Sequence, residues 1–227
     1  MTDSQDIPLH LFQTYHTLEL PPRMQQSVNR LKMMNPELKH HLYDDAMCRE
    51  FIKTHFPLNV VCAFDKLVPG AYKADLWRYC VLYIHGGIYL DIKYGCVDGF
   101  KLADLINQPR IVKDREMLGV CGIYQALMIH KPHDIFLHNC IENVVANVHN
   151  GYYGKNALMV TGPHMAMNHV PRNVIETSEL ELSENKRCIL RKGQPILRIY
   201  KGYRSELAQT QLCPPYYTMW DRRQIYR

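Results

Sequence analysis

The sequence predicts an α/β fold in which a mostly parallel central sheet is flanked by helices. Two observations predict this class. Residues 9–57 alternate between strand-like and helix-like patterns in the order strand, helix, strand, helix, which is typical of parallel sheets covered by helices. The 227 residues are also enough to bury one sizeable core. We therefore expect a single domain over residues 1–227.

The first strand and helix follow from apolar spacing and from turn residues. Residues 9–12 alternate apolar and polar side chains, as a half-buried strand does, and a loop follows at 13–15. Pro21-Pro22 opens a helix whose apolar residues recur at i, i+4 and i+7, and Asn35-Pro36 ends it.

The second strand and helix repeat this order. We expect a short strand at 40–43, followed by a helix that Asp44 or Asp45 caps and that ends before Pro57. Residues 72–85 then form a helix with one apolar stripe, which Gly86-Gly87 terminates.

A buried strand at 88–90 follows this double glycine and places Asp91 at its carboxyl end. Ligands of parallel sheets bind outside this edge. The remaining elements are read from weaker patterns: a helical piece at 101–107, a strand at 119–128, a helix at 132–149, a turn at 161–164 and a hairpin about Lys192-Gly193.

The charge of the chain is unevenly distributed. The chain has 27 basic and 22 acidic residues, a net charge of +5. Residues 186–227 hold ten Lys and Arg against Glu206 and Asp221, so that this segment carries +8 and the rest of the chain −3. Such a local excess indicates an anion site and argues against a nucleic-acid partner, which would call for a wider basic surface.

Composition excludes several other classes. No apolar stretch reaches the ~20 residues that a membrane-spanning helix needs, so we expect no transmembrane segment. The eight cysteines lie at least 14 residues apart, which excludes the C-x-x-C pairs of zinc and redox sites. Residues 1–8 have neither a basic region nor an apolar core. The expected location is therefore cytoplasmic.

Three charged residues are expected to meet at one edge of the sheet. Asp75 and Arg78 lie three apart on one helical face, and Asp91 follows only 16 residues after Asp75. The alternative for Asp75 and Arg78 is an ordinary surface ion pair. The double glycine and the short strand favour convergence of two carboxylates and a guanidinium, where a polyhydroxylated or phosphorylated ligand could bind.

The segment Lys73–Lys93 resembles the signature of family 32 glycosyltransferases, the sugar-binding-region family with a DXD motif. Initiation-specific mannosyltransferases belong to this family, and clostridial glucosylating toxins have a similar core. The resemblance is strong over residues 7–98 and thin afterwards. Other stretches that agree with the family are Ile7-Pro8, Phe12–Tyr15, Leu20-Pro21, Gly162-Pro163 and Tyr216–Trp220.

This resemblance implies a GT-A fold with a donor half at 7–98 and an acceptor half with a closing segment at 99–227. It implies a retaining hexosyltransferase that uses a nucleotide-diphosphate sugar, with a UDP-sugar favoured and GDP-mannose as the alternative. The expected acceptor is a glycan or glycoprotein. A divalent metal, Mn²⁺ or Mg²⁺, usually accompanies such donors.

The resemblance also assigns site residues. Asp75 and Arg78 would hold sugar hydroxyls, and Asp91 would be the first DXD aspartate and the metal ligand. Tyr15 would stack on the base. The expected donor-binding residues are Gln13, Thr14, Tyr15, Asp75, Arg78, Gly87, Tyr89, Asp91, Trp220 and Arg222. The expected catalytic residues are Asp75, Arg78, Asp91, Lys93 and His164, the last as an acceptor-orienting group in the 161–164 turn.

One departure from the family pattern concerns the metal. Lys93 stands at the third DXD position, where an ammonium replaces an oxygen ligand and repels a cation. Three outcomes stay open: Lys93 itself neutralises the diphosphate, a metal is held by Asp91, donor phosphates and water with Asp98 as a distant helper, or the protein binds nucleotide sugars with weak or lost turnover.

Overall fold

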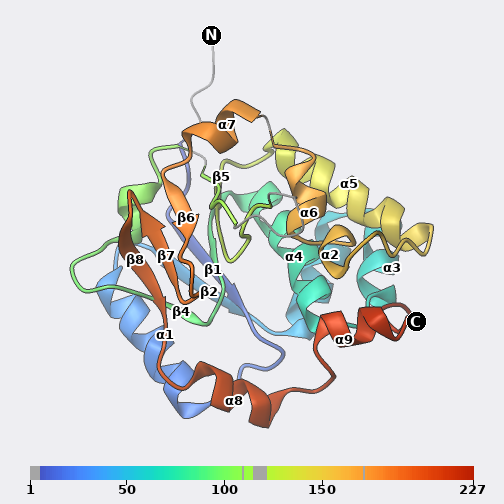
Figure 1. Ribbon diagram of the computed structural model, residues 1–227, viewed down its shortest axis with the longest axis horizontal. Coiled ribbons are helices and arrows are strands. Elements are labelled where there is room, and N and C mark those ends of the chain that lie inside the picture. The colour runs from blue at the N-terminus through green and yellow to red at the C-terminus, as the bar shows by residue number, and fades with distance from the viewer. Residues whose placement is uncertain (1–5, 109, 115–121, 171) are drawn as a thin grey trace.

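The computed structural model describes residues 6–108, 110–114, 122–170 and 172–227. Its strands are β1 (His10–Thr14), β2 (Lys39–Tyr43), β3 (Gly87–Leu90), β4 (Tyr94–Cys96), β5 (Leu127–His130), β6 (Leu180–Leu182), β7 (Cys188–Arg191) and β8 (Gln194–Ile199). Its α-helices are α1 (Pro22–Met34), α2 (Asp45–His55), α3 (Leu58–Lys66), α4 (Gly70–His85), α5 (Ile135–His149), α6 (Pro163–Met167), α7 (Arg172–Thr177), α8 (Tyr203–Thr210) and α9 (Tyr216–Asp221), with short 3₁₀ turns at Leu102–Leu105 and Ala157–Met159 (Figure 1).

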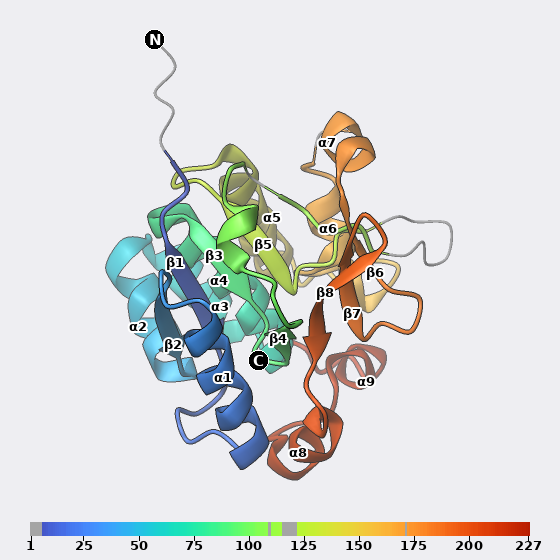
Figure 2. The same ribbon diagram turned by 90° about the vertical axis from the view of Figure 1, so that its left-hand side faces the viewer.

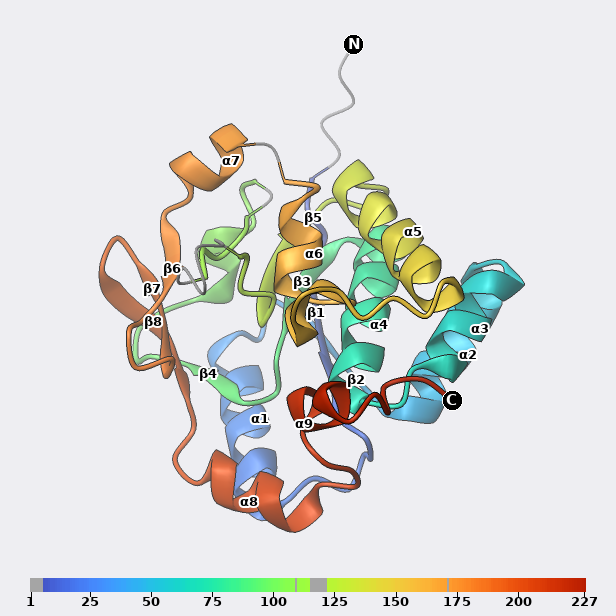
Figure 3. The same cartoon turned by 45° about the vertical axis from the view of Figure 1, so that its right-hand side comes forward.

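The central sheet has the strand order β2-β1-β3-β5. β1 pairs in parallel with both β2 and β3, and β5 adds an antiparallel edge beside β3. Helices α2 to α5 gather on one side of this sheet, and the remaining strands lie on the other side (Figure 3). The expected α/β class with a mostly parallel sheet is therefore confirmed.

A second sheet, in the order β4-β8-β7-β6, is antiparallel throughout. Its β7-β8 hairpin turns at Lys192 and Gly193, whose φ angles of 51° and 77° are those of a tight hairpin turn. The hairpin was expected from this dipeptide. The whole sheet was not, because β4 and β6 are only three residues long and so carry almost no periodic signal.

Alternation along the central strands divides the core between the two faces of the sheet. Phe12 and Tyr89 pack with the helices α2 to α5, whereas their neighbours Leu11 and Ile88 pack with the second sheet. All four residues of β3 are buried, as in a strand covered on both faces.

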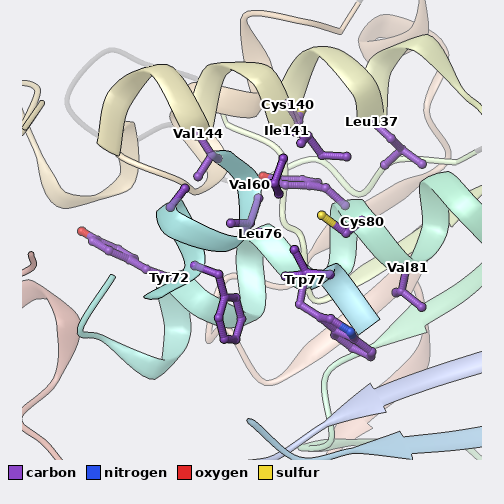
Figure 4. Close-up of a cluster of buried hydrophobic side chains, with 14 of the residues drawn as sticks. Val60, Tyr72, Leu76, Trp77, Cys80, Val81, Leu137, Cys140, Ile141 and Val144 are labelled. Carbon is purple, nitrogen blue, oxygen red and sulfur yellow. The ribbon is translucent and has the colours of Figure 1, made fainter. Parts of the chain in front are cut away.

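Helix α4 lies against α5 through small and branched side chains. Leu76 and Cys80 of α4 belong to the same buried cluster as Cys140 and Val144 of α5 (Figure 4). Gly86 ends α4 with a φ of 62°, and Gly87 follows with a φ of 102°. A Cβ at Gly87 would lie 2.7 Å from the carbonyl oxygen of His10, so glycine is needed for β3 to pair closely with β1.

Three sequence expectations differ from the structure. Helix α3 was not expected, because no side chain caps it, yet Val60, Val61 and Phe64 bury one face of it. The strand expected at 119–128 is found at 127–130, and its residues 119–121 lie outside the described ranges. The turn at 161–164 continues into α6. No helix of the described part is long and apolar enough to cross a membrane.

Several histidines cluster near the amino end of β1. His10 Nδ1 lies 2.9 Å from His41 Nε2, and the ring of His85 is 6.3 Å from that of His10. Burial, together with the neighbouring cations, lowers the pKa of His41 to about 4, and burial lowers the pKa of His40 similarly. Because these groups prefer to stay neutral in the folded protein, protonation favours the unfolded chain.

We therefore expect the free energy of unfolding to fall as the pH is lowered from about 6.5, the ordinary histidine value, to about 4. Urea denaturation at a series of pH values measures this slope. His41→Gln should reduce the slope, whereas replacement of exposed His149 should leave it unchanged. Equal slopes for the wild type and His41→Gln would contradict the assignment.

Candidate functional site

Four side chains of alternating charge form a chain at the carboxyl end of β3. Arg78 Nη2 lies 3.2 Å from Asp75 Oδ1 and 3.6 Å from Asp91 Oδ1, and Lys93 Nζ lies 2.7 Å from Asp91 Oδ2. The exposed fraction of the Arg78 side chain is 8% and that of Lys93 is 19%. This is the convergence of charges that the spacing of Asp75, Arg78 and Asp91 predicts.

Local geometry explains why these residues meet. Asp75 and Arg78 share a face of α4 because they are one turn apart, and β3 returns beside that helix immediately after the double glycine. The Arg78 guanidinium lies 4.4 Å from the centre of the Tyr89 ring and donates to the carbonyl oxygen of Gln125 at 2.7 Å. Together with the two carboxylates, these contacts surround the cation and offset the cost of its burial.

The pKa values of Asp75 and Asp91 are shifted in opposite directions. Burial raises the pKa of Asp75 above its usual value, and the charge of Arg78 and a hydrogen bond from Thr161 only partly oppose this. Burial would also raise the pKa of Asp91, but Lys93 and Arg78 outweigh it and lower that pKa. The pKa of Asp91 is thus held below its usual value, and that of Asp75 above it.

The residues at this edge do not fit a resident divalent metal. Both oxygens of Asp91 already have partners, because Oδ2 contacts the Lys93 ammonium and Oδ1 accepts a hydrogen bond of 2.8 Å from the Tyr89 hydroxyl. Mn²⁺ and Mg²⁺ need several free oxygen ligands. Among the described residues, no group of three or more His, Cys, Asp or Glu is arranged to hold an ion.

Sequence reasoning missed the groups that complete the site from distant segments. The Thr161 hydroxyl donates to Asp75 Oδ2 at 2.8 Å, and the Tyr79 hydroxyl donates to the Thr161 carbonyl at 2.9 Å. The side chain of Gln125 donates to the Tyr79 hydroxyl, and its own Oε1 has no partner in the described part. Only the turn signal at 161–164 could have pointed to Thr161.

The three residues expected around the base are each engaged in contacts within the protein. Tyr15 is 9% exposed, packs with Tyr200 and Tyr203, and bonds through its hydroxyl to Thr210 of α8. Gln13 is fully buried and bonds to His40. Thr14 donates to the carbonyl of Tyr43. Tyr15 shares its cluster with Ile92, the residue between Asp91 and Lys93, so it lies near the charged chain. Contact of the three residues with a base stays a prediction.

Three further residues expected at the site are Gly87, Tyr89 and His164. Tyr89 lies beside the charged chain, where it contacts Asp91 and Arg78, whereas Gly87 stands at the opposite end of β3, next to His10. His164 is 5% exposed, with Nδ1 3.2 Å from the Asn156 amide nitrogen, and burial lowers its pKa. Their roles toward a ligand stay predictions.

The last two expected residues lie in the C-terminal helix α9 and directly after it. Trp220 donates to the Tyr153 carbonyl at 2.6 Å, so its indole nitrogen anchors α9. Arg222 is exposed. Tyr216, which was not singled out as a site residue, lies close enough to Asp75 for the carboxylate to raise its pKa further after burial.

The segment that holds this site matches a known family. Residues 21–111 match the family model described as the glycosyltransferase sugar-binding region containing DXD motif. Over these residues the chain is thus similar to the sugar-binding region of DXD glycosyltransferases. The matched segment contains the whole charged chain from Asp75 to Lys93, so the expected family is confirmed on the residues that carried the resemblance.

Curated relatives match about half of the chain. The mannosyl phosphorylinositol ceramide synthase of Saccharomyces cerevisiae is 32% identical over 116 residues, which are 51% of this chain and 30% of that protein. The initiation-specific alpha-1,6-mannosyltransferase of Candida albicans is 27% identical over 130 residues, which are 53% of this chain and 33% of that protein. The chain therefore matches about a third of the length of these relatives.

Among solved structures, the glycosyltransferase PaToxG superposes with a TM-score of 0.55 at 14% identity, covering 75% of this chain and 71% of that chain. At this identity the likeness concerns the fold alone. It confirms the GT-A type of α/β fold.

Removal of the central cation should destabilise the protein strongly. Arg78→Met leaves buried carboxylates without their partner, and we expect the free energy of unfolding to fall by about 3–5 kcal/mol. Arg49→Met is the matched control, since it removes an arginine from the exposed pair with Asp65 and should change the free energy of unfolding little. Equal losses in urea denaturation would show that Arg78 is not the centre of the site.

Proposed function

We propose that the protein is a retaining hexosyltransferase that moves a sugar from a nucleotide-diphosphate donor to an acceptor hydroxyl. The observation that carries this proposal is the charged chain at the carboxyl end of β3, inside the sugar-binding region of a glycosyltransferase family. Asp75 and Arg78 would hold sugar hydroxyls. Asp91 would orient Lys93 and contact the donor.

The chemistry requires stabilisation of negative charge on the leaving group. The bond between the anomeric carbon and the diphosphate oxygen breaks, the acceptor hydroxyl oxygen forms the new bond, and the hydroxyl proton passes to the departing phosphate. A positioned cation stabilises the oxygen on which charge develops. Lys93 is the candidate, because its Nζ lies 2.7 Å from Asp91 Oδ2 and its side chain is only partly exposed.

We further propose that this transfer needs no resident divalent metal. Lys93 stands where the DXD pattern has its second carboxylate, and it occupies an oxygen of the first one. Burial would lower the pKa of Lys93, but the contact with Asp91 outweighs this and raises it, so the amine stays protonated. The ammonium thus takes over the charge of the ion.

The names of the relatives support a particular donor sugar and a particular class of acceptor. Two of the matched proteins are named as mannosyl-transferring enzymes, which supports GDP-mannose as donor over the UDP-sugar that the sequence favoured. One name includes phosphorylinositol ceramide, which supports a phosphorylated lipid acceptor beside the glycan or glycoprotein acceptor expected from the sequence.

A second function from another class is nucleotide-sugar binding with weak or lost turnover. The lysine at the third DXD position favours it, because that residue departs from the family pattern. The two functions differ in one readout. A transferase releases the nucleoside diphosphate and a binding protein does not.

The donor site is tested by incubation with GDP-mannose, UDP-glucose and UDP-galactose and measurement of released nucleoside diphosphate. We expect release from one donor, and we expect Asp91→Asn to reduce it by about 10²- to 10³-fold, as the loss of a charge-stabilising group does. Asp65→Asn on the exposed face is the matched control. Donor binding by calorimetry without release would favour the second function, and binding of no donor would exclude both.

The role of Lys93 is tested with and without EDTA. We expect wild-type release to be the same in EDTA and in Mn²⁺, and Lys93→Asp to lose about 10²- to 10³-fold in both. Lys53→Asp, at an exposed lysine of α2, should retain activity. If EDTA abolishes wild-type release, or if Lys93→Asp gains Mn²⁺-dependent release, then Lys93 does not replace the ion.

A further inference from the structure

Two neighbouring cavities lie beside β8, and no residue of helices α2 to α5 lines either of them. The smaller, of about 540 Å³, lies at the junction of β7, β8 and α8, and the larger, of about 1160 Å³, runs between α1 and the strands β4 and β8. Both are lined by residues 198–201. We call the two together the basic groove. Asp75, Arg78, Asp91 and Lys93 do not line it.

The groove is lined by an excess of cations. One acidic residue, Asp98, lines it and pairs with Arg30. The other cations form no ion pair with any described residue. The basic residues that line the groove are Arg23, Arg30, Arg187, Arg198, Lys201 and Arg204. Their charges minus that of Asp98 equal the net charge of the whole chain, +5.

A buried carboxylate fixes the shape of the groove. Glu206 of α8 accepts hydrogen bonds from the backbone nitrogens of Arg23 at 2.8 Å and Met24 at 3.1 Å, and from the Tyr200 hydroxyl at 2.9 Å. It thereby caps the first turn of α1, where no local side chain does so. Figure 2 shows α8 held beside the start of α1. The cations therefore face a preformed hollow.

The groove borders the candidate donor site. The backbone nitrogen of Tyr200 donates to the Lys93 carbonyl at 3.0 Å. Tyr203 lines the smaller cavity, and the charges of Lys93 and Asp91 both act on its hydroxyl. A ligand held in the groove would thus lie next to the Asp91–Lys93 pair.

We infer that the basic groove binds the phosphate group of an anionic acceptor, held by Arg198, Lys201 and the neighbouring arginines. This inference rests on the proposed function in one respect, because only a transferase has an acceptor to bind. Phosphate binding in the groove does not itself depend on turnover. Guanidinium groups match phosphate oxygens in forked geometry. A volume of 540 Å³ suits a small headgroup.

A soluble compound and a lipid headgroup are two sources of such a phosphate, and two probes separate them. Calorimetry measures binding of myo-inositol 1-phosphate, and sedimentation measures binding to phosphatidylcholine vesicles with and without phosphatidylinositol. Binding to the soluble probe supports a free phosphorylated acceptor. Binding only to the phosphatidylinositol vesicles supports a lipid headgroup. Either result supports the groove as a phosphate site if the variants below behave as expected.

The double variant Arg198→Gln/Lys201→Gln tests the site, because both residues are exposed and line both cavities. We expect binding about ten- to a hundredfold weaker, since two charged contacts are lost. The matched control is Arg49→Gln/Lys66→Gln on α2 and α3, which removes the same charge from another surface. It should bind as the wild type does.

Three results would overturn the inference: no binding of either probe, equal weakening in the control, or stronger binding of a single-stranded oligonucleotide than of both phosphate probes. Donor binding is measured in the same variants. If the wild type binds the phosphate probe but no nucleotide sugar, the proposed function fails while the groove remains a phosphate site. Unchanged donor binding in Arg198→Gln/Lys201→Gln shows that the groove is separate from the donor site.

Discussion

The placement of one guanidinium holds the candidate site together. Arg78 lies between two carboxylates from different elements, Asp75 of α4 and Asp91 after β3, and also binds the backbone before β5 through Gln125. A buried charge is tolerated only when its partners are close and well directed. The position of α4 on the sheet and the exit of the chain from β3 therefore depend on this one residue, which also joins Lys93 in keeping Asp91 ionised.

The parts that could be predicted from the sequence are those made by neighbours in the chain. Asp75, Arg78, the double glycine and Asp91 lie within 17 residues, so helix and strand periodicity alone brings them together. Thr161 reaches Asp75 from 86 residues away, and no local pattern encodes that contact. The same reason applies to the second sheet, whose short strands pair across distant segments.

The structure shows where the basic residues of the C-terminal segment lie. The basic C-terminal segment was expected to form an anion site. In the structure, Arg198, Lys201 and Arg204 line the basic groove, and Arg223 lies over the ring of Tyr153 at 4.3 Å. The cation that contacts Asp91 is Lys93, from the donor half. The two clusters would thus serve different phosphates, that of the donor at Lys93 and that of an acceptor in the groove.

The most direct test of the account is a crystal structure of the protein with a bound, non-hydrolysable nucleotide sugar, grown in the presence of Mn²⁺. The account predicts the diphosphate within hydrogen-bond distance of Lys93 Nζ, with that ammonium still on Asp91 and with no metal density between Asp91 and the phosphates. A Mn²⁺ ion coordinated by Asp91, with Lys93 turned away from the diphosphate, would contradict it.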